Sequence, residues 1–133
     1  MYGESTSEKV ERVATIIVDA AFKVHTTLGP GLLESVYSIC LTYELRKRGL
    51  AVDREVILPV LYDGVKLEAG LRIDLLVEGC VIIEAKAVER LIPVFEAQVL
   101  TYLKLTGHAL GFLINFNVPL IKDGIKRVIL SKP

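Results

Sequence analysis

Apolar residues recur at helical spacing through the first third of the chain, which predicts two helices. The first follows Ser5-x-x-Glu8, which has the pattern of a capping box. Gly29-Pro30-Gly31 ends this helix and turns the chain. A second helix is expected from about Leu32 to Arg48, with Gly49 as its C-cap. The apolar stripe of the first helix consists of Val10, Val13, Ile16, Ile17, Ala20, Ala21 and Val24.

The middle of the chain is rich in β-forming residues and predicts strands. Asp63-Gly64 is a strong hairpin turn signal, and Glu78-Gly79 marks a second turn. Apolar residues on both sides of the second turn fall on both strand faces, so the sheet is expected to be covered on both sides. The strands expected here are Arg54–Tyr62, Val65–Glu68, Leu71–Val77 and Val81–Ala87.

The last third predicts one more helix and two more strands. The helix has Pro93 in its first turn and ends at Gly107. The strands are expected at Leu110–Phe116 and Gly124–Leu130. The resulting order, α-α-β-β-β-β-α-β-β, predicts one domain over residues 1–133. Its class is α/β or α+β, with helices packed against a mixed sheet.

Composition excludes several classes of protein. With 52% apolar and 24% charged residues, the chain is not intrinsically disordered. Its 16 basic and 16 acidic residues give zero net charge, which excludes a histone-like coat. The polar start, residues 1–11, predicts no signal peptide. Cys40 and Cys80 lack C-x-x-C spacing and are expected to be reduced in the cytoplasm. The two histidines, His25 and His108, lack zinc-site spacing.

Three ionisable residues lie inside the two strands expected to be most buried, where such residues are rare. Asp74 lies within Leu71–Val77, and Glu84 and Lys86 lie within Val81–Ala87. Burying a charge is costly unless it is paired or binds a metal. Because Glu84 and Lys86 are two residues apart, they share one face of their strand.

The length of the intervening turn decides whether Asp74 joins this face. A two-residue loop at Glu78-Gly79 places Asp74 opposite Ile83, and Glu84 then faces away. A three-residue loop that includes Cys80 places Asp74 directly opposite Glu84, because a one-residue shift flips the face of a strand. A functional role requires the longer loop, which Gly79 permits because glycine adopts positive φ.

The longer loop would bring two carboxylates together, and their repulsion would raise one pKa. A divalent hard cation removes this penalty, and oxygen ligands select Mg²⁺ or Mn²⁺. Such a metal lowers the pKa of a bound water, while Lys86 orients that water or stabilises developing charge. The alternative is an ordinary ion pair of Lys86 with Asp74 or Glu84 in a half-exposed sheet.

The helices add further candidates. Glu34 and Tyr37 are neighbours three residues apart, although Glu34 alone also suits the helix dipole. Gln98 and Tyr102 meet on one face of the third helix, or else form a surface glutamine beside a core tyrosine. The basic residues that are candidates for nucleic-acid phosphates, or else solvated ends of elements, are Arg46, Lys47, Arg48, Lys122, Lys126 and Arg127.

Together these residues resemble the PD-(D/E)xK nuclease superfamily, because Asp74 is followed after nine residues by Glu84-x-Lys86. Gly31-x-x-Glu34-x-x-Tyr37 is similar to the signature of the GxxExxY family, a small-domain branch of that superfamily. Phe95 stands where many members have histidine. The resemblance covers about residues 9 to 130 and includes the blocks Arg72–Val77, Glu96–Gln98 and Leu113–Asn117.

The resemblance implies a restriction-endonuclease-like core, a central mixed β-sheet flanked by helices. It implies that Lys86 assists the attacking water. Gln98-x-x-x-Tyr102 is similar to the Q-x-x-x-Y motif of recombination-type exonucleases, where it positions metal or nucleic acid. The metal ligands that the resemblance implies are Glu34, Asp74, Glu84 and the main-chain carbonyl of Ala85.

The function expected is therefore that of a nuclease dependent on Mg²⁺ or Mn²⁺, acting on DNA or RNA in the cytoplasm without a membrane partner. The presence of all three of Asp74, Glu84 and Lys86 favours this interpretation. A non-catalytic nucleic-acid- or protein-binding module with the same fold is the alternative, which zero net charge favours. Hydrolysis of a smaller phosphoester is a third. The sequence leaves open whether the chain forms a homodimer.

Overall fold

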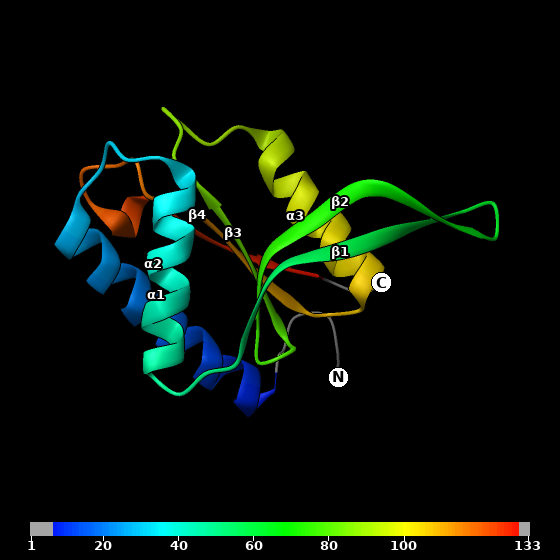
Figure 1. Cartoon of the computed structure of the whole chain (residues 1–133), viewed down its shortest axis with the longest axis horizontal. Helices are drawn as coiled ribbons and strands as arrows, with labels where there is room; N and C mark the ends of the chain where they lie inside the picture. The colour runs from blue at the N-terminus through cyan, green and yellow to red at the C-terminus, as the bar shows by residue number, and fades with distance from the viewer. Residues whose placement is uncertain (1–6, 131–133) are drawn as a thin grey trace.

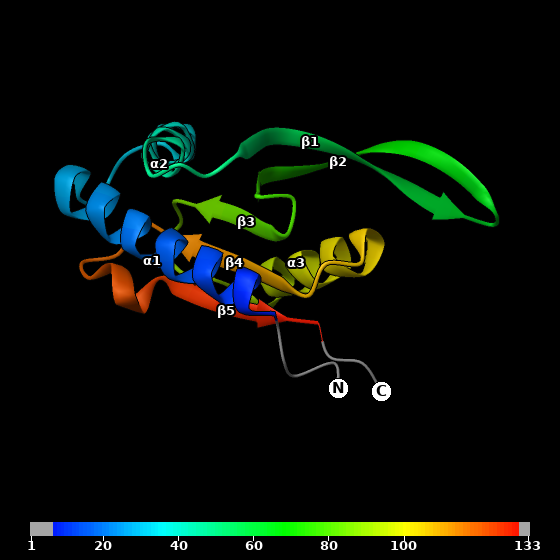
Figure 2. The ribbon, with the colours of Figure 1, turned by 90° about the horizontal axis from the view of Figure 1, so that it is seen from below.

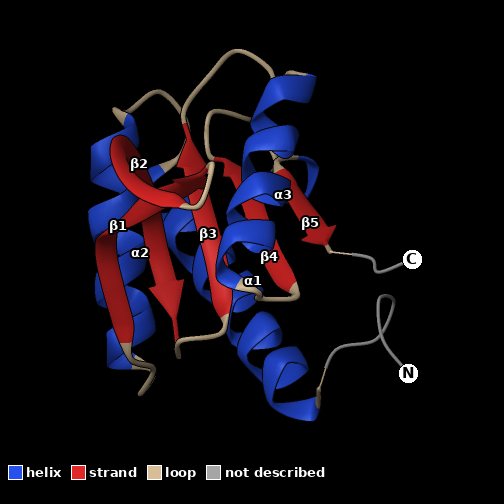
Figure 3. Cartoon of the chain, turned by 90° about the vertical axis from the view of Figure 1, so that its right-hand side faces the viewer, coloured by secondary structure: helices blue, strands red, loops and turns tan. Residues whose placement is uncertain are grey.

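The chain folds into a mixed sheet with helices on both faces, as Figures 1 and 2 show for residues 7–130, which the computed structural model describes. The sheet order is β1-β2-β3-β4-β5, with β3 and β4 parallel and the other neighbours antiparallel. Figure 3 shows α3, which connects the two parallel strands, lying over one face of the sheet. The elements are α1 (Glu8–Leu28), α2 (Glu34–Lys47), β1 (Val52–Tyr62), β2 (Val65–Val77), β3 (Val81–Lys86), α3 (Pro93–Thr106), β4 (Leu110–Asn115), the 3-10 helix η1 (Ile121–Asp123) and β5 (Ile125–Ile129).

The α/β class and the mixed sheet are confirmed, but the predicted order contains one strand too many. The stretches 65–68 and 71–77 form a single strand, β2. Gly70 has a φ of 79°, and the pairing with β1 shifts in register between Leu58 and Val60. This irregularity absorbs the residues that interrupt the alternation, so the strand continues past them. The other predicted elements begin and end within two residues of their expected bounds.

The ends of the first two helices follow from their flanking residues. Ser7 caps α1, because its hydroxyl accepts from the N–H of Val10 at 3.2 Å. Ser5 of the predicted capping box lies outside the described residues. At the other end Gly29, with φ 69°, donates its N–H to the carbonyl of His25. The second helix ends with Arg48 as its cap, one residue before the predicted Gly49.

Two apolar clusters hold the layers together. One joins α1 and α2 to one face of the sheet, around Ile17, Tyr37 and Leu41. The other joins α3 to the opposite face, around Val99 and Leu103. Strands β3 and β4 are thus covered on both sides, as their apolar composition predicts, whereas the first half of β2 is exposed (Figure 2). Among the described residues, no helix is long and apolar enough to span a membrane.

Tyr37 ties the turn between α1 and α2 to the C-terminal half of the chain. Its hydroxyl donates to the carbonyl of Gly29 at 2.6 Å and accepts from the N–H of Leu32 at 3.1 Å. Its ring stacks on Phe116, with 4.7 Å between the two centroids. The start of α2 is therefore held by a residue of the segment that follows β4.

Asn115, the last residue of β4, and Asn117, which follows it, complete this attachment. Asn117 accepts the N–H of Gly31 at 3.1 Å. The buried Asn115 accepts the N–H of Val88 and donates to the carbonyl of Val88, at 3.1 and 3.0 Å. One short segment thus fixes both the turn before Glu34 and the chain that follows β3.

Replacing Tyr37 by phenylalanine keeps the ring stack and removes the hydroxyl. Two half-buried backbone groups then lose a partner, so Tyr37→Phe should lower the free energy of unfolding by about 1–3 kcal/mol. Urea denaturation followed by circular dichroism measures this change. Tyr43→Phe is the matched control, because the side chain of Tyr43 is 67% exposed. Equal effects of the two substitutions would contradict the attachment.

Candidate active site

The turn between β2 and β3 has the longer loop that the site requires. Val77 pairs with Val81 across the hairpin, so three residues lie between them. Glu78 and Gly79 both have positive φ, 53° and 62°, and Cys80 donates its N–H to the carbonyl of Val77. The predicted register is confirmed.

Asp74 and Glu84 each accept a backbone N–H from the opposite strand. The N–H of Asp74 donates to Glu84 Oε2 at 2.9 Å, and the N–H of Ala85 donates to Asp74 Oδ2 at 3.0 Å. The Cα pairing of β2 with β3 reaches only as far as Leu75 and Ile83. The two carboxylates therefore replace carbonyls as acceptors where the regular ladder ends, and this exchange fixes both side chains.

The sheet is distorted at the same place. Ile73 packs with the α3 cluster and Leu75 with the α1–α2 cluster, although residues two apart in a regular strand share a face. On β1, Glu55 lies between the pairs Arg54–Leu75 and Val56–Ile73, is not itself among the β1–β2 partners, and has a φ of 52°. Such a backbone costs roughly 1–3 kcal/mol in a residue other than glycine, and it is most common at functional sites.

Burial and mutual charge make this pair electrostatically unfavourable. Glu84 is only 4% exposed. Burial, and next the charge of Asp74, raise the pKa of Glu84 from the usual 4.5 to about 8. Burial also raises the pKa of Asp74, while the hydrogen bond from Ala85 and the charge of Lys86 lower it. Without a further cation, the site holds two ionised carboxylates poorly at neutral pH.

Lys86 approaches the pair without an ion-pair partner. Its Nζ lies 4.6 Å from the ring centroid of Phe95 on α3. The ion pairs formed between residues 7 and 130 do not include it. Its charge is nevertheless felt at Asp74, at Glu84 and at Glu34. This arrangement disfavours the alternative in which Lys86 is a structural partner of one carboxylate.

The two helices contribute in different ways. Glu34 begins α2, and burial raises its pKa most, with the charge of Asp74 also raising it and that of Lys86 lowering it. Tyr102 is buried on α3, where burial and then the charge of Glu84 raise its pKa. Gln98 is half-buried one turn before Tyr102 on the same face. Glu34 and Tyr102 thus lie within electrostatic range of the carboxylate pair.

A pocket of about 180 Å³ opens beside Asp74, between α2 and the β1–β2 strands. Three of its charged residues, Arg54, Glu55 and Arg72, are not among the site residues predicted from the sequence, and neither are its two serines. Arg72 has a detectable signal, because it lies two residues before Asp74 on one strand. Arg54 and Glu55 have none, since only the pairing of β1 with β2 places them. The pocket is lined by Glu34, Ser35, Ser38, Arg54, Glu55, Arg72 and Asp74.

Most of the basic residues predicted to contact nucleic acid take part in local structure. Arg46 donates to the carbonyl of Val52 at 2.7 Å. Arg46, Lys47 and Arg48 lie at the end of α2 opposite Glu34, about 20 Å away at 1.5 Å per residue. The ion pairs that involve the predicted residues are Arg48–Glu44, Lys126–Glu96 and Arg127–Glu11.

The oxygen ligands suit a hard divalent cation, although they do not form a complete cage. Among residues 7–130, no three side chains of His, Cys, Asp or Glu are gathered closely enough to hold a metal ion. Asp74 and Glu84 offer two adjacent carboxylates whose raised pKa values a cation would reverse. Ala85, whose main-chain carbonyl is a further candidate ligand, lies between Glu84 and Lys86 in the chain. Such a partial set fits Mg²⁺ or Mn²⁺, which commonly keep several waters.

Glu84→Gln should stabilise the metal-free protein at pH 8. Between pH 4.5 and 8 the folded state holds a proton on Glu84 that the unfolded state releases, so stability falls as pH rises. Glutamine removes this slope and still accepts the N–H of Asp74. The gain should be on the order of a few kcal/mol at pH 8 and vanish near pH 4.5. Urea denaturation at several pH values in EDTA measures it, with exposed Glu68→Gln as control; a gain independent of pH would contradict it.

Comparisons with known proteins agree with this geometry. The family model described as PD-(D/E)XK nuclease superfamily matches residues 11–128, which is most of the chain. No curated protein and no solved structure matches the chain in the corresponding searches. The family match spans the hairpin with its carboxylate pair, α2 and α3, and the sheet has the mixed order of a restriction-endonuclease-like core. The chain therefore belongs to the PD-(D/E)XK nuclease superfamily.

Proposed function

We propose that this protein is a metal-dependent nuclease that hydrolyses phosphodiester bonds in DNA or RNA. The observation that carries the proposal is the exchange between β2 and β3, in which Asp74 and Glu84 each take the other strand's N–H. This exchange holds two carboxylates side by side in a buried place, where they destabilise the metal-free protein. Superfamily membership supports nuclease chemistry in general terms.

The proposed ligands for Mg²⁺ or Mn²⁺ are Asp74, Glu84 and the carbonyl of Ala85, with Glu34 completing the set. When bound, such an ion lowers the pKa of a water and neutralises charge on a phosphate oxygen. Glu34 is exposed at the start of α2. The contacts of Tyr37 hold the turn from which it projects.

Lys86 is proposed to orient the attacking water and to stabilise the charge that develops on the phosphate. Its ammonium group lies over the ring of Phe95, and because no ion pair within residues 7–130 includes it, the group is available. Gln98 and Tyr102 are proposed to position metal or nucleic acid from the α3 side. The charge of Glu84 acts on Tyr102, which supports this proximity.

We further propose that the chain belongs to the GxxExxY branch and acts in the cytoplasm. Gly31, at φ 98°, and Tyr37 shape the turn before Glu34, which gives the spacing of that signature a physical reason. Cys40 and Cys80 are both free thiols, as suits a reducing compartment.

A non-catalytic binding module is the second candidate. Zero net charge favours it, because proteins that bind nucleic acid are usually basic. The basic residues at Arg46–Arg48 and at Lys122, Lys126 and Arg127 remain proposed phosphate contacts under either function. A binding module has no use for paired carboxylates with raised pKa values, and for this reason the nuclease is preferred.

Mn²⁺ or Mg²⁺ should raise the melting temperature of the wild-type protein. A cation that binds only the folded state adds about 1.4 kcal/mol at ten times its Kd. Asp74→Asn and Glu84→Gln should remove this shift. Asp63→Asn, in the exposed turn between β1 and β2, should keep it. Differential scanning fluorimetry measures all four proteins. No shift at millimolar Mn²⁺ in the wild type would favour the binding module.

Lys86→Ala should leave folding and the metal-induced shift intact and reduce cleavage. Assistance of the proposed kind contributes about 10²–10⁴-fold to the rate. Cleavage of labelled single- and double-stranded DNA and RNA, per folded molecule, gives the rate. Lys104→Ala, on the exposed side of α3, removes the same charge elsewhere. A Lys86→Ala protein that cuts at the wild-type rate would remove this residue from the mechanism.

A further inference from the structure

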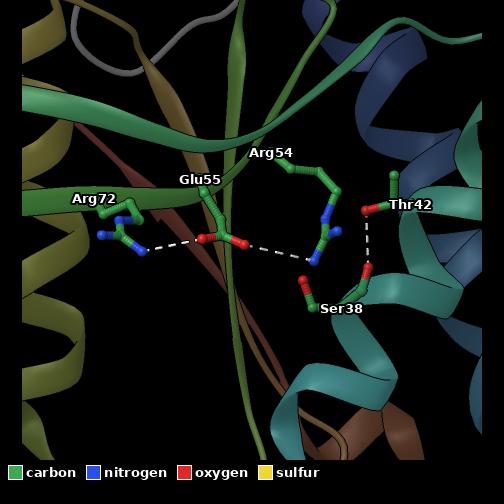
Figure 4. A network of polar contacts seen from close by, with 5 residues as sticks. All are labelled: Ser38, Thr42, Arg54, Glu55 and Arg72. Atoms are coloured by element: carbon green, nitrogen blue, oxygen red, sulfur yellow. Dashed lines mark hydrogen bonds and ion pairs between the residues drawn. The ribbon is translucent and has the colours of Figure 1, made fainter.

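Two arginines face the pocket beside Asp74 and share one carboxylate. Arg72 Nη1 lies 3.0 Å from Glu55 Oε1, and Arg54 Nη2 lies 4.0 Å from Glu55 Oε2. Figure 4 shows Glu55 between the two guanidinium groups, with Arg54 extending toward Ser38 on α2. Arg54, Arg72 and Glu55 together carry a charge of +1 and converge from β1 and β2 on one place, and the carboxyl groups of Glu34 and Asp74 line the same pocket.

The ion pairs of this group are exposed and easily exchanged. The exposed fractions of the side chains are 34% for Arg54, 57% for Arg72 and 56% for Glu55. Exposed ion pairs contribute little to stability, so a contribution to the stability of the fold does not account for these two ion pairs. Glu55 also has the left-handed backbone described above, which the fold tolerates here at a cost.

The dimensions and walls of the pocket suit a phosphate group. Its volume of about 180 Å³ is many times the roughly 10–15 Å³ that a single water requires, so a phosphate group can enter it. Ser35 and Ser38 of α2 line the wall opposite the arginines and offer hydroxyl donors. Arginine matches phosphate oxygens with two parallel N–H groups, a geometry that lysine does not provide.

We propose that Arg54 and Arg72 bind one phosphate of the nucleic-acid strand, which takes the place that the Glu55 carboxylate holds in the free protein. This inference rests on the proposed function, since it names how that site holds its substrate. Glu55 and Asp74 line the same pocket, so the bound phosphate lies beside the carboxylate pair. Contacts of this kind read the backbone and not the bases, so binding is independent of sequence.

Glu55 has a defined role in this arrangement. In the free protein it keeps two like charges together in the orientation that a phosphate needs. When the strand binds, its carboxylate competes with the phosphate for the same N–H groups. Removing this competitor should therefore strengthen binding, whereas removing either arginine should weaken it. Because the two kinds of substitution should change the affinity in opposite directions, they distinguish a binding role from a merely structural one.

The test measures binding without cleavage. Fluorescence anisotropy in EDTA follows a labelled 12-nucleotide DNA strand and, separately, an RNA strand of the same sequence, over a range of salt concentrations. Arg54→Gln and Arg72→Gln should each weaken binding by roughly threefold to tenfold. Each should also reduce the magnitude of the salt slope by about 0.7 to 1. Glu55→Gln should tighten binding by a similar factor.

Arg12→Gln on α1 is the matched control, because it removes one exposed positive charge from another element and should change binding little. Melting temperatures establish that each variant is folded. Weaker binding by Glu55→Gln, or arginine variants that bind like Arg12→Gln, would overturn the inference. A wild-type protein that binds neither strand at low salt would overturn it as well.

The outcome for this site and that for catalysis are separable. Wild-type protein that cleaves with Mn²⁺, while the arginine variants bind normally, leaves the nuclease standing and overturns the phosphate site. Protein that shows the expected binding pattern but no cleavage with either metal leaves the phosphate site standing and supports the binding module. The relative affinities for the DNA and RNA strands identify which backbone the site prefers.

Discussion

Two carboxylates held side by side where a β-ladder ends are the constraint on which this structure depends. Asp74 and Glu84 replace two backbone acceptors, so they cannot move apart without leaving N–H groups unpaired. They also cannot approach full ionisation together without a cation. In the free protein, satisfied hydrogen bonds and repulsion between two carboxylates thus occur at the same place. The fold itself therefore prepares a binding site for a cation.

The elements around the pair bring further charged side chains toward it. Lys86 approaches from the same strand and is steadied by Phe95, while α2 brings Glu34 from the other side. Neither is hydrogen-bonded to the pair. Lys86 lies over the ring of Phe95, and the turn before Glu34 is held by Tyr37, whose ring stacks on Phe116. Packing thus determines the geometry of the charged groups, because exposed charges position one another only weakly.

Sequence reasoning predicted the parts of this site that depend on local periodicity. The sequence left two loop lengths open at Glu78–Cys80, and a functional role for Asp74 and Glu84 required the longer one, which the pairing of Val77 with Val81 confirms. Helix ends and most strand bounds follow from caps and turns. The division of β2 into two strands was wrong, because only the pairing with β1 shows that Gly70 lies within one continuous strand. Arg54 and Glu55 were missed for a related reason. Their place beside Asp74 depends on register between β1 and β2 and on a left-handed backbone at Glu55, and neither is encoded in a short-range pattern.

The attachment of Tyr37 to the segment after β4 has a consequence for the order of events during synthesis. Glu34, Asp74 and Glu84 leave the ribosome well before Phe116 and Asn117, which hold the turn that precedes Glu34. Contacts between residues so distant in the chain form late, because the long intervening loop must close first. The hairpin that holds Asp74 beside Glu84 is local in the chain, whereas the turn before Glu34 is fixed only once residues 116–117 have been made. Coupling this later segment to the first helices therefore delays the placement of Glu34 relative to the carboxylate pair.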